Sequence, residues 1–581
     1  MKLSELLQTG WRDTTLTPLG DLDIALVHML QQLQPSSDAR HLWLAALASH
    51  QWGRGHACLD LQAWQDSAPQ LLGWSESALA ALPPDLAAGL PDMPWATGEA
   101  SPLVVDGQRL YLRRAWQAEQ TIRGQLVAMQ QSRVTPSDLA QQLSLLFGDD
   151  SNNRQRLACE HAAQNALTLI TGGPGTGKTT TVVKLLRILQ AGSAAPLRTS
   201  LAAPTGKAAA RLMQAMTQAR ASLSPQEAAC LPTSAQTLHK LLYAPHGAPP
   251  HLEADVIVVD EASMIDLELM ARLLKAVPAQ SRLVLLGDKD QLASVQAGAV
   301  MAQLCQAPWL QKHIMGLTHS HRFDPDHGIG AWARSCNAGD SAGLQQLWQA
   351  APTGCWSDPV SVSQLSSPQS AAAVVLPSLA LGFADWLHLL APHQQGLACS
   401  DDQALALLQS FGRVGVLCAL REGPWGVNHF NLQLQQAMGF ADTEWFIGRP
   451  VMARRNDYAL GLMNGDLGLC LPTLVEGELR LRVAFPDGQA GVRWLLPSRL
   501  EAIDTVFAMT VHQSQGSEFE QVLLVLPDVA TPVLTRELIY TGMTRAREKL
   551  CVWAPTPGLL MQAITTTVVR SGGLAETRLF I

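Results

Sequence analysis

The chain has 581 residues, of which 47% are hydrophobic and only 15% charged, with a formal net charge of −8 and a sequence pI of about 6.1. A single hydrophobic core serves about 250–300 residues at most, so we expect several domains. The negative net charge excludes a basic nucleic-acid coat, and any DNA site must therefore depend on a local positive groove.

The low charged content is open to two interpretations. Soluble domains usually carry about 25% charged residues, so the chain either has large cores or buries much surface against partner subunits. Ten cysteines are scattered without a Cys-x-x-Cys pair, which argues against a zinc ribbon or an iron–sulfur site. These free thiols suit a reducing compartment, and the N-terminus shows no apolar signal segment, so we expect a cytoplasmic location.

Residues 1–120 predict a small, mainly helical domain that binds partners. Segments 25–33 (ALVHMLQQL) and 42–50 (LWLAALASH) have the apolar spacing of helices. Segment 103–114 (LVVDGQRLYLRR) predicts a hairpin that turns at Asp106-Gly107 and closes the domain. No motif with recognisable chemistry lies in this region.

Two series of short apolar runs, alternating with helical stretches, predict two parallel α/β domains over residues 121–350 and 351–581. The first series is 167–170, 200–203, 256–259 and 283–286; the second is 414–420, 505–509, 521–526 and 550–553. Residues 444–498 alternate in short strands with two glycine turns, which predicts a small β-barrel inserted in the second domain. The apolar stretch 371–390 is interrupted by Pro377 and Asp385, so it predicts buried helices and not a membrane span.

A phosphate-binding loop follows the first predicted strand. Residues 172–179 read GGPGTGKT and fit the pattern G-x-x-x-x-G-K-[ST] between a strand and a helix. Glycines let backbone N–H groups surround phosphates at a helix N-terminus. We expect Lys178 to reach the β- and γ-phosphates of ATP and Thr179 to bind Mg²⁺. The predicted nucleotide-binding residues here are Gly172, Gly173, Pro174, Gly175, Thr176, Gly177, Lys178, Thr179 and Thr180.

Acidic residues follow two later strands. VIVVDEASM (256–264) delivers Asp260 and Glu261 at a strand's carboxyl end, where ligands bind in open α/β sheets. We expect Asp260 to hold Mg²⁺, directly or through water, and Glu261 to orient or deprotonate the attacking water. LVLLGDKDQL (283–292) repeats the arrangement and places the amide of Gln291 where it can sense the γ-phosphate.

The order and spacing of further segments resemble those of superfamily 1 DNA helicases. The segments LAAPTGKAAARL (201–212), TLHKLL (237–242), LTHSHRF (317–323), TVHQSQGSEF (510–519) and YTGMTRAR (540–547) resemble motifs Ia, Ic, IV, V and VI. NGDLG (464–468) resembles a signature near the small β-barrel of the RecD-like branch. Segments 49–61 and 110–122 are similar to the N-terminal domain of the RecD family, the alpha subunits of exodeoxyribonuclease V (RecBCD).

This resemblance implies two RecA-like P-loop domains, an SH3-like inserted barrel, and ATP hydrolysis between the two domains with Mg²⁺. It implies an ATP-dependent 5′→3′ DNA helicase subunit in a heterotrimer with RecB-like and RecC-like subunits. Such a complex acts on single-stranded and duplex-end DNA in double-strand break repair by homologous recombination. The family resemblance places the nuclease centre in a partner subunit.

The resemblance also assigns residues. Gln155 is placed like an adenine-reading glutamine, and Arg322 and Arg545 like arginine fingers; they join Lys178, Asp260, Glu261 and Gln291 around the nucleotide. The implied DNA contacts are Pro204, Thr205, Thr237, His239, Thr510, His512 and Ser514, which would hold phosphates without reading sequence. Two positions depart from the family pattern: Gln513 stands for a lysine of motif V, and His321 for a tyrosine of motif IV.

Two other functions were weighed against a DNA motor. A nucleotide-gated structural subunit is favoured by the low charged content, but intact Glu261, Arg322 and Arg545 argue against lost catalysis. A small-molecule P-loop kinase fits the loop alone and does not account for the second α/β domain.

Overall fold

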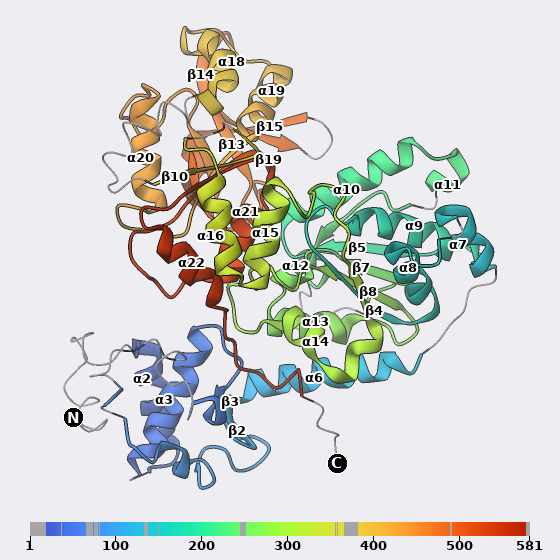
Figure 1. The fold of residues 1–581 in the computed structure, drawn as a ribbon, viewed down its shortest axis with the longest axis vertical. Helices are drawn as coiled ribbons and strands as arrows, with labels where there is room; N and C mark the ends of the chain where they lie inside the picture. The colour runs from blue at the N-terminus through green and yellow to red at the C-terminus, as the bar shows by residue number, and fades with distance from the viewer. Residues whose placement is uncertain are drawn as a thin grey trace.

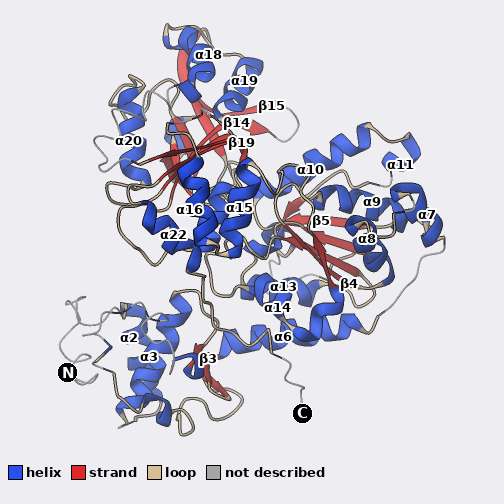
Figure 2. Ribbon diagram, viewed as in Figure 1, coloured by secondary structure: helices blue, strands red, loops and turns tan. Residues whose placement is uncertain are grey.

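The computed structural model describes residues 19–36, 38–64, 72, 74, 79–80, 82–132, 138–148, 150–229, 231–243, 251–354, 356, 358–364, 381–487 and 491–576. It shows an N-terminal region beside two α/β units, each with helices on both faces of a sheet (Figures 1 and 2). Within these ranges, no helix has both the length and the apolar character that crossing a membrane requires. The extreme N-terminus and residues 371–380 of the apolar stretch fall outside them.

The N-terminal region is mainly helical, as predicted. Its core forms around α3, whose Trp43, Leu44 and Leu47 are almost fully buried. The predicted hairpin is confirmed by the antiparallel pair β2–β3, which belongs to a three-stranded sheet of order β1-β3-β2. The elements are α2 (Asp21–Leu33), α3 (Ala39–Gly53), β1 (Leu59–Asp60), η1 (Leu86–Gly89), β2 (Leu103–Asp106) and β3 (Arg109–Leu112).

The first α/β unit contains a six-stranded parallel sheet of order β6-β5-β7-β8-β4-β9. Alternate residues of the apolar strands face opposite layers: Ile257 and Val259 pack with α6 and α13, while Val256 and Val258 pack with α8 and α9. Burial on both faces explains why the strands are continuous apolar runs. The strands are β4 (Leu167–Gly172), β5 (Thr199–Ala203), β6 (Gln236–Thr237), β7 (Val256–Val259), β8 (Arg282–Gly287) and β9 (Ile314–Leu317). The helices are α6 (Arg113–Gln130), α7 (Leu139–Phe147), α8 (Arg154–Gln164), α9 (Lys178–Ala191), α10 (Gly206–Ala221), α11 (Pro225–Ala229), α12 (Leu238–Leu241), η2 (Ala262–Met264), α13 (Leu267–Ala276), α14 (Val300–Gln306) and η3 (Pro308–His313).

The second α/β unit contains a five-stranded parallel sheet of order β10-β19-β18-β11-β17. Its core on one face includes Ile329 and Trp332 of α15 and Leu344 of α16, so both helices pack on this sheet although they precede residue 351. Strands β10 (Val360–Ser363), β11 (Val414–Cys418), β17 (Ala508–Thr510), β18 (Phe519–Val525) and β19 (Ala546–Trp553) form the sheet. The helices are α15 (Gly328–Ala338), α16 (Ser341–Ala350), α18 (Ala384–Gln394), α19 (Asp401–Phe411), α20 (Val427–Ala437), α21 (Arg536–Met543) and α22 (Pro557–Thr565).

The predicted insertion is a five-stranded antiparallel sheet of order β15-β14-β13-β12-β16. Its strands are β12 (Pro450–Ala453), β13 (Leu467–Val475), β14 (Glu478–Asp487), β15 (Gly491–Leu495) and β16 (Ile503–Thr505), with η4 (Pro497–Arg499) before the last. The predicted strand 505–509 is therefore wrong in its bounds. Thr505 ends an antiparallel strand, whereas Ala508 begins the parallel strand β17.

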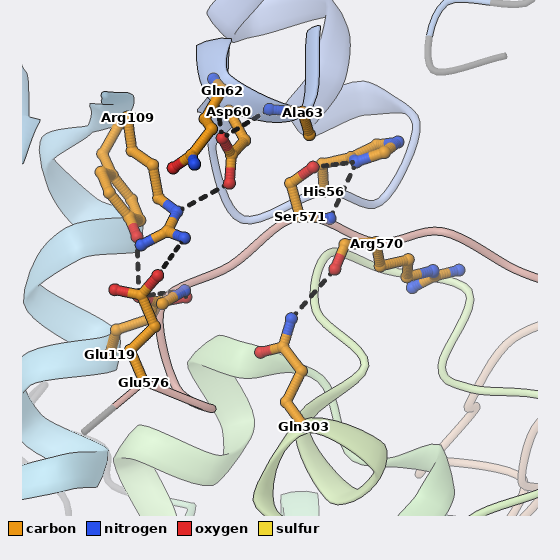
Figure 3. A network of polar contacts seen from close by, with 12 residues as sticks. His56, Asp60, Gln62, Ala63, Arg109, Glu119, Gln303, Arg570, Ser571 and Glu576 are labelled. Atoms are coloured by element: carbon orange, nitrogen blue, oxygen red, sulfur yellow. Dashed lines mark hydrogen bonds and ion pairs between the residues drawn. The ribbon is translucent and has the colours of Figure 1, made fainter. Parts of the chain in front are cut away.

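The chain's last described segment, residues 566–576, is called the strap. It leaves α22 and runs between the N-terminal region and α6 of the first unit (Figure 1). Ser571 pairs with the N-terminal region, because Ala57 N donates to its carbonyl at 2.8 Å and its own N–H donates to His56 Nδ1 at 3.0 Å. Gln303 of α14 donates its amide to the Arg570 carbonyl at 3.0 Å (Figure 3). The strap thus joins all three parts of the molecule.

Two glycines let the strap approach a buried carboxylate. Gly573 N donates to both oxygens of Glu119 at 2.9 and 3.0 Å. A Cβ on Gly573 would lie 2.8 Å from Tyr111 Oη, and one on Gly572 would lie 2.7 Å from Gln303 Nε2. Burial raises the pKa of Glu119 to about 7, although these hydrogen bonds oppose that shift. Leu574, fully buried in the core beside α6, fixes the end of the strap.

Candidate functional site

The predicted phosphate loop connects β4 to α9 as its pattern requires. Gly175 and Gly177 have φ values of +77° and +81°, which L side chains rarely adopt. Lys178 Nζ donates to the carbonyls of Gly172 at 2.5 Å and Gly173 at 3.1 Å, so its ammonium lies over the loop. The loop leaves no room for side chains: a Cβ on Gly175 would lie 2.4 Å from Arg322 Cβ. This cradle of backbone and one cation suits a phosphate chain.

Gln155 lies against the same loop. It sits in the first turn of α8, which Asn153 caps by accepting from Gln155 N at 3.0 Å. Its side-chain Nε2 donates to the Thr176 carbonyl at 3.3 Å, and a Cβ on Gly177 would lie 2.3 Å from the same Nε2 atom of Gln155. The structure therefore brings Gln155 to the nucleotide loop, and its adenine-reading role stays a prediction.

Acidic groups follow β7 and β8 at one edge of the sheet, beside β4. Glu261 has a left-handed φ of +53°, and its N–H donates to Asp260 Oδ1 at 2.9 Å. Burial and the neighbouring charge of Glu261 raise the pKa of Asp260 to about 6, while Lys178 opposes the shift. Burial also raises the pKa of Asp288, and Lys178 again opposes it. A divalent cation would favour the ionised form of Asp260, and a carboxylate together with the hydroxyl of Thr179 is an oxygen-donor set of the kind that suits Mg²⁺.

Two residues of the second unit, Arg545 and Tyr540, reach this edge of the first sheet, and Arg545 does so by contacting Gln291 of the first unit. Its Nε2 donates to Asp288 Oδ2 at 2.9 Å, and its Oε1 accepts from Arg545 Nη2 at 2.6 Å. Tyr540 of α21 donates its hydroxyl to Asp288 Oδ2 at 3.2 Å, and it lies 2.8 Å from where a Cβ on Gly173 would be. Arg545 is 2% exposed, and burial lowers its pKa, although the charges of Glu261 and Glu518 oppose that shift.

Arg322, the other predicted arginine finger, lies beside the loop. The backbone before it is fixed there, because His321 N donates to the Gly175 carbonyl at 2.9 Å and Ser320 Oγ to the Pro174 carbonyl at 3.2 Å. Arg322 Nη2 donates to Glu518 Oε2 at 2.8 Å. Its Nη1 is buried and has no hydrogen-bond partner among the described residues. A buried donor of this kind, next to a phosphate cradle, suits an anionic ligand.

The predicted DNA contacts differ in their exposure and in their local roles. Thr205 and Thr237 cap helices α10 and α12 by accepting from Ala208 N at 3.2 Å and Lys240 N at 3.3 Å. His239 is exposed, while Ser514 is fully buried and donates to the Val511 carbonyl at 2.7 Å. The structure therefore does not turn the Ser514 hydroxyl toward solvent. Pro204, Thr510 and His512 are partly exposed, and burial lowers the pKa of His512.

A cavity of about 620 Å³ lies between the two units. Two predicted contacts, Thr205 and His512, line it. The sequence analysis missed its basic lining, which consists of Lys207, Arg421, Arg454 and Arg455. Those residues come from three separate stretches, the start of α10, the segment after β11 and the segment after β12, so only folding shows that they share one cavity. Arg421 and Arg454 also pair with Asp504, and Arg455 pairs with Glu501, so Lys207 and the remaining donors of these arginines provide the positive charge that would suit an anion on an acidic chain.

Lys207 is the least expected member of this cavity. Its Nζ is buried without a hydrogen-bond partner among the described residues. Burial lowers its pKa to about 8, and the nearby charge of Asp466 opposes the shift. Asp466 belongs to the NGDLG segment, and its neighbour Met463 lies 2.9 Å from where a Cβ on Gly206 would be. The inserted sheet thus closes over the first turn of α10.

The described residues also bear on two other kinds of site, metal-ligand clusters and reactive cysteines. They contain no group of three or more His, Cys, Asp or Glu side chains that could hold a metal ion. All eight cysteines described are free, and burial raises the pKa values of most of them. Several groups with shifted pKa values, among them Asp260, Asp288, Arg545 and Lys207, lie at the loop and the cavity, which suits a functional site there.

Three family models match separate parts of the chain, from the N-terminal region to the second α/β unit. Residues 16–111 match the RecBCD enzyme subunit RecD N-terminal domain, 155–297 an AAA domain, and 505–553 a UvrD-like helicase C-terminal domain. The chain is similar to the ATP-dependent RecD2 DNA helicase of Deinococcus radiodurans, at 33% identity over 68% of this chain and 48% of that one. Among solved structures it is similar to a Bacteroides Pif1 helicase, with 16% identity, a TM-score of 0.36, and coverage of 76% and 95%.

Two relatives extend over nearly all of the chain. The RecBCD enzyme subunit RecD of Mycolicibacterium smegmatis is 36% identical over 95% of this chain and 96% of that one. The RecD subunit of Haemophilus influenzae is 33% identical over 82% and 81%. The match includes the N-terminal region as well as both α/β units. The chain belongs to the RecD family of superfamily 1 helicases.

Proposed function

We propose that this chain is the ATP-driven 5′→3′ DNA helicase subunit of an exodeoxyribonuclease V complex, with RecB-like and RecC-like partners. The observation that carries the proposal is the convergence of both α/β units on one phosphate loop. Lys178 lies over the loop, Gln291 and Arg545 join the two units at 2.6 Å, and Arg322 packs against Gly175. A motor needs this geometry, because hydrolysis can then change the spacing of the two units.

The proposed roles follow from position and charge. Lys178, Arg322 and Arg545 would stabilise negative charge on the transferring phosphoryl group. Glu261 would orient or deprotonate the attacking water, and Gln291 would sense the γ-phosphate from its place between Asp288 and Arg545. Thr179 and Asp260 would hold Mg²⁺, which neutralises phosphate charge when bound. Gln155 would contact the base.

Single-stranded DNA would occupy the cavity between the units. Thr205 and His512 line it, and the basic residues opposite supply the positive field that phosphates require. Thr237, His239, Pro204 and Thr510 would extend the contact along α10, α12 and the loop after β17. Ser514, buried beneath that loop, would support its backbone.

The division of labour along the chain is also part of the proposal. Residues 1–120 would bind partners, residues 121–327 would form the first ATPase unit, and residues 328–581 would form the second unit with its SH3-like inserted barrel, in place of the boundary at 350 expected from the sequence. Packing of α15 and α16 on the second sheet supports a boundary before Gly328. Exposed Leu22, Met29 and Leu33 on α2, at 76%, 45% and 67%, support a partner surface in the N-terminal region.

Strand separation on forked duplexes with a 5′ or a 3′ single-stranded tail tests this function. We expect the chain, alone or with its partners, to need a 5′ tail and hydrolysable ATP. A preference for the 3′ tail would refute the polarity. A chain lacking residues 1–110 should keep nucleotide binding and lose co-purification with the partners; undiminished co-purification would refute the role of the N-terminal region. The bacterial relatives and the free cysteines support a cytoplasmic, DNA-associated location.

A further inference from the structure

Glu518 contacts three arginines that come from three different segments. It accepts from Arg322 Nη2 at 2.8 Å, forms an ion pair with Arg211 of α10, and lies 3.3 Å from Arg547 Nε. Its side chain is only 10% exposed. Burial alone would raise its pKa, but the charges and hydrogen bonds of Arg211 and Arg322 lower that pKa to about 2. Glu518 is therefore ionised at all working pH values and neutralises a cluster of cations.

The segment Ser517-Glu518 contacts both predicted arginine fingers, Arg322 and Arg545. Arg545 Nη1 donates to the carbonyl of Ser517, the residue before Glu518, at 3.2 Å. Arg545 Nη2 meanwhile contacts Gln291, while Arg322 keeps Nη1 buried and unpaired among the described residues. Arg322 thus has one terminal nitrogen held by Glu518, while its other terminal nitrogen has no hydrogen-bond partner among the described residues.

Glu518 also connects Arg322 to the helix that lines the cavity. Arg211 lies on α10, the helix that Thr205 caps at the cavity wall. Gly516, two residues before Glu518, approaches that cap: a Cβ there would lie 3.5 Å from Thr205 Oγ1. A displacement of α10 by DNA would therefore move Arg211 and, through their ion pair, Glu518 relative to Arg322.

We propose that Glu518 is a positioning residue that holds Arg322 back from the phosphates until DNA reaches α10. This inference rests on the proposed function and names how DNA regulates its ATP site. Transfer of Arg322 from Glu518 to a phosphate oxygen does not leave a buried charge unpaired, because Arg211 and Arg547 remain on the carboxylate. If a buried carboxylate had only one cationic partner, the departure of that partner would leave its charge unpaired in the interior, which is costly. The cluster of three arginines is what makes Glu518 suited to an exchange.

The test compares ATP turnover of Glu518→Gln with that of wild type, with and without single-stranded DNA. Glutamine keeps the shape and removes the charge that holds Arg322. We expect turnover without DNA to rise by about tenfold, the factor that one charge-assisted hydrogen bond represents. The stimulation ratio, which is turnover with DNA divided by turnover without it, should fall by a similar factor. Structural damage alone would lower turnover and could not raise it.

Glu520→Gln is the matched control. Glu520 lies two residues further along β18 and pairs with Arg413 on the surface, where the Arg413 side chain is 48% exposed. The change in charge is identical, and the stimulation ratio should equal that of wild type. An unchanged ratio in Glu518→Gln, or equal losses of turnover with and without DNA, would overturn the inference.

Arg211→Gln gives an independent arm in case Glu518→Gln fails to fold. It removes the connection to α10 at the partly exposed end of the cluster, and we expect a lower stimulation ratio with DNA affinity retained. A wild-type ratio in this variant would overturn the connection. If wild type itself shows no DNA-stimulated turnover, the proposed function fails and not the role of Glu518, so the two failures are distinguishable.

Discussion

Arg545 donates to the side-chain oxygen of Gln291 at 2.6 Å, across 254 residues of sequence and from one α/β unit to the other. The same guanidinium also donates to the carbonyls of Thr541 and Ser517, each at 3.2 Å. Each of the three guanidinium nitrogens, Nε, Nη1 and Nη2, therefore donates a hydrogen bond. A planar fork with fixed donor directions can make this set of contacts, and an ammonium cannot.

Replacing Arg545 should therefore abolish hydrolysis even when the charge is kept. Arginine fingers contribute about 10³–10⁵ in rate, so we expect Arg545→Ala to lose turnover by that order. Arg545→Lys should recover less than about tenfold of it, because lysine lacks the fork. Steady-state ATP turnover and nucleotide affinity, measured together, check this. Arg334→Lys, which changes a surface pair with Asp326, is the control and should match wild type. Full turnover in Arg545→Lys would contradict the assignment.

Lys207 should make DNA affinity depend on pH. Burial lowers the pKa of its ammonium to about 8, so the cation is present below that pH and is lost as the pH rises through it. The arginines of the cavity do not titrate in this range. We expect the affinity for single-stranded DNA to fall between pH 7 and pH 9 in wild type, and to be weaker and flatter in Lys207→Met. Fluorescence anisotropy with labelled DNA measures both. Identical pH profiles for the two proteins would refute a role for Lys207.

The way the candidate ATP-site segments come together could largely be predicted from the sequence, because their signals are local. A strand, a glycine loop and a helix follow one another at residues 167–191, and each acidic pair comes directly after an apolar strand. Parallel strands then bring those loops to one edge of the sheet. The chemistry of each loop could be inferred without knowing its neighbours.

The cavity and the arginine cluster could not be predicted in this way. Lys207 and Glu518 lie in segments whose likeness to helicase motifs is evident, but their charged neighbours Asp466 and Arg211 are far away in sequence. The packing of α15 on the second sheet likewise depends on contacts with α21 that apolar spacing does not specify. The strap sequence SGGL (571–574) indicates only a loop, and its burial comes from Glu119 and α6.

The position of the strap should depend on the absence of a side chain at Gly573. A Cβ on Gly573 would lie 2.8 Å from Tyr111 Oη and 2.9 Å from Glu119 Oε2, and both of these side chains are buried. We expect Gly573→Ala to displace the strap and to increase the rate of proteolysis near residue 570. Gly558→Ala is the matched control, since a Cβ there meets nothing within 4 Å. Equal protease resistance of the two variants would show that the strap does not depend on this contact.

ATP hydrolysis by the purified chain, with and without single-stranded DNA, tests the central claim most directly. Wild type should turn over ATP faster with DNA. Lys178→Gln, which removes the ammonium over the phosphate loop, should lose turnover by about 10²–10³ while keeping its fold and its partners. Turnover that survives in purified Lys178→Gln would contradict the site assignment. If wild type showed no turnover, either alone or in the reconstituted complex, the chain would be a nucleotide-gated scaffold and not a motor.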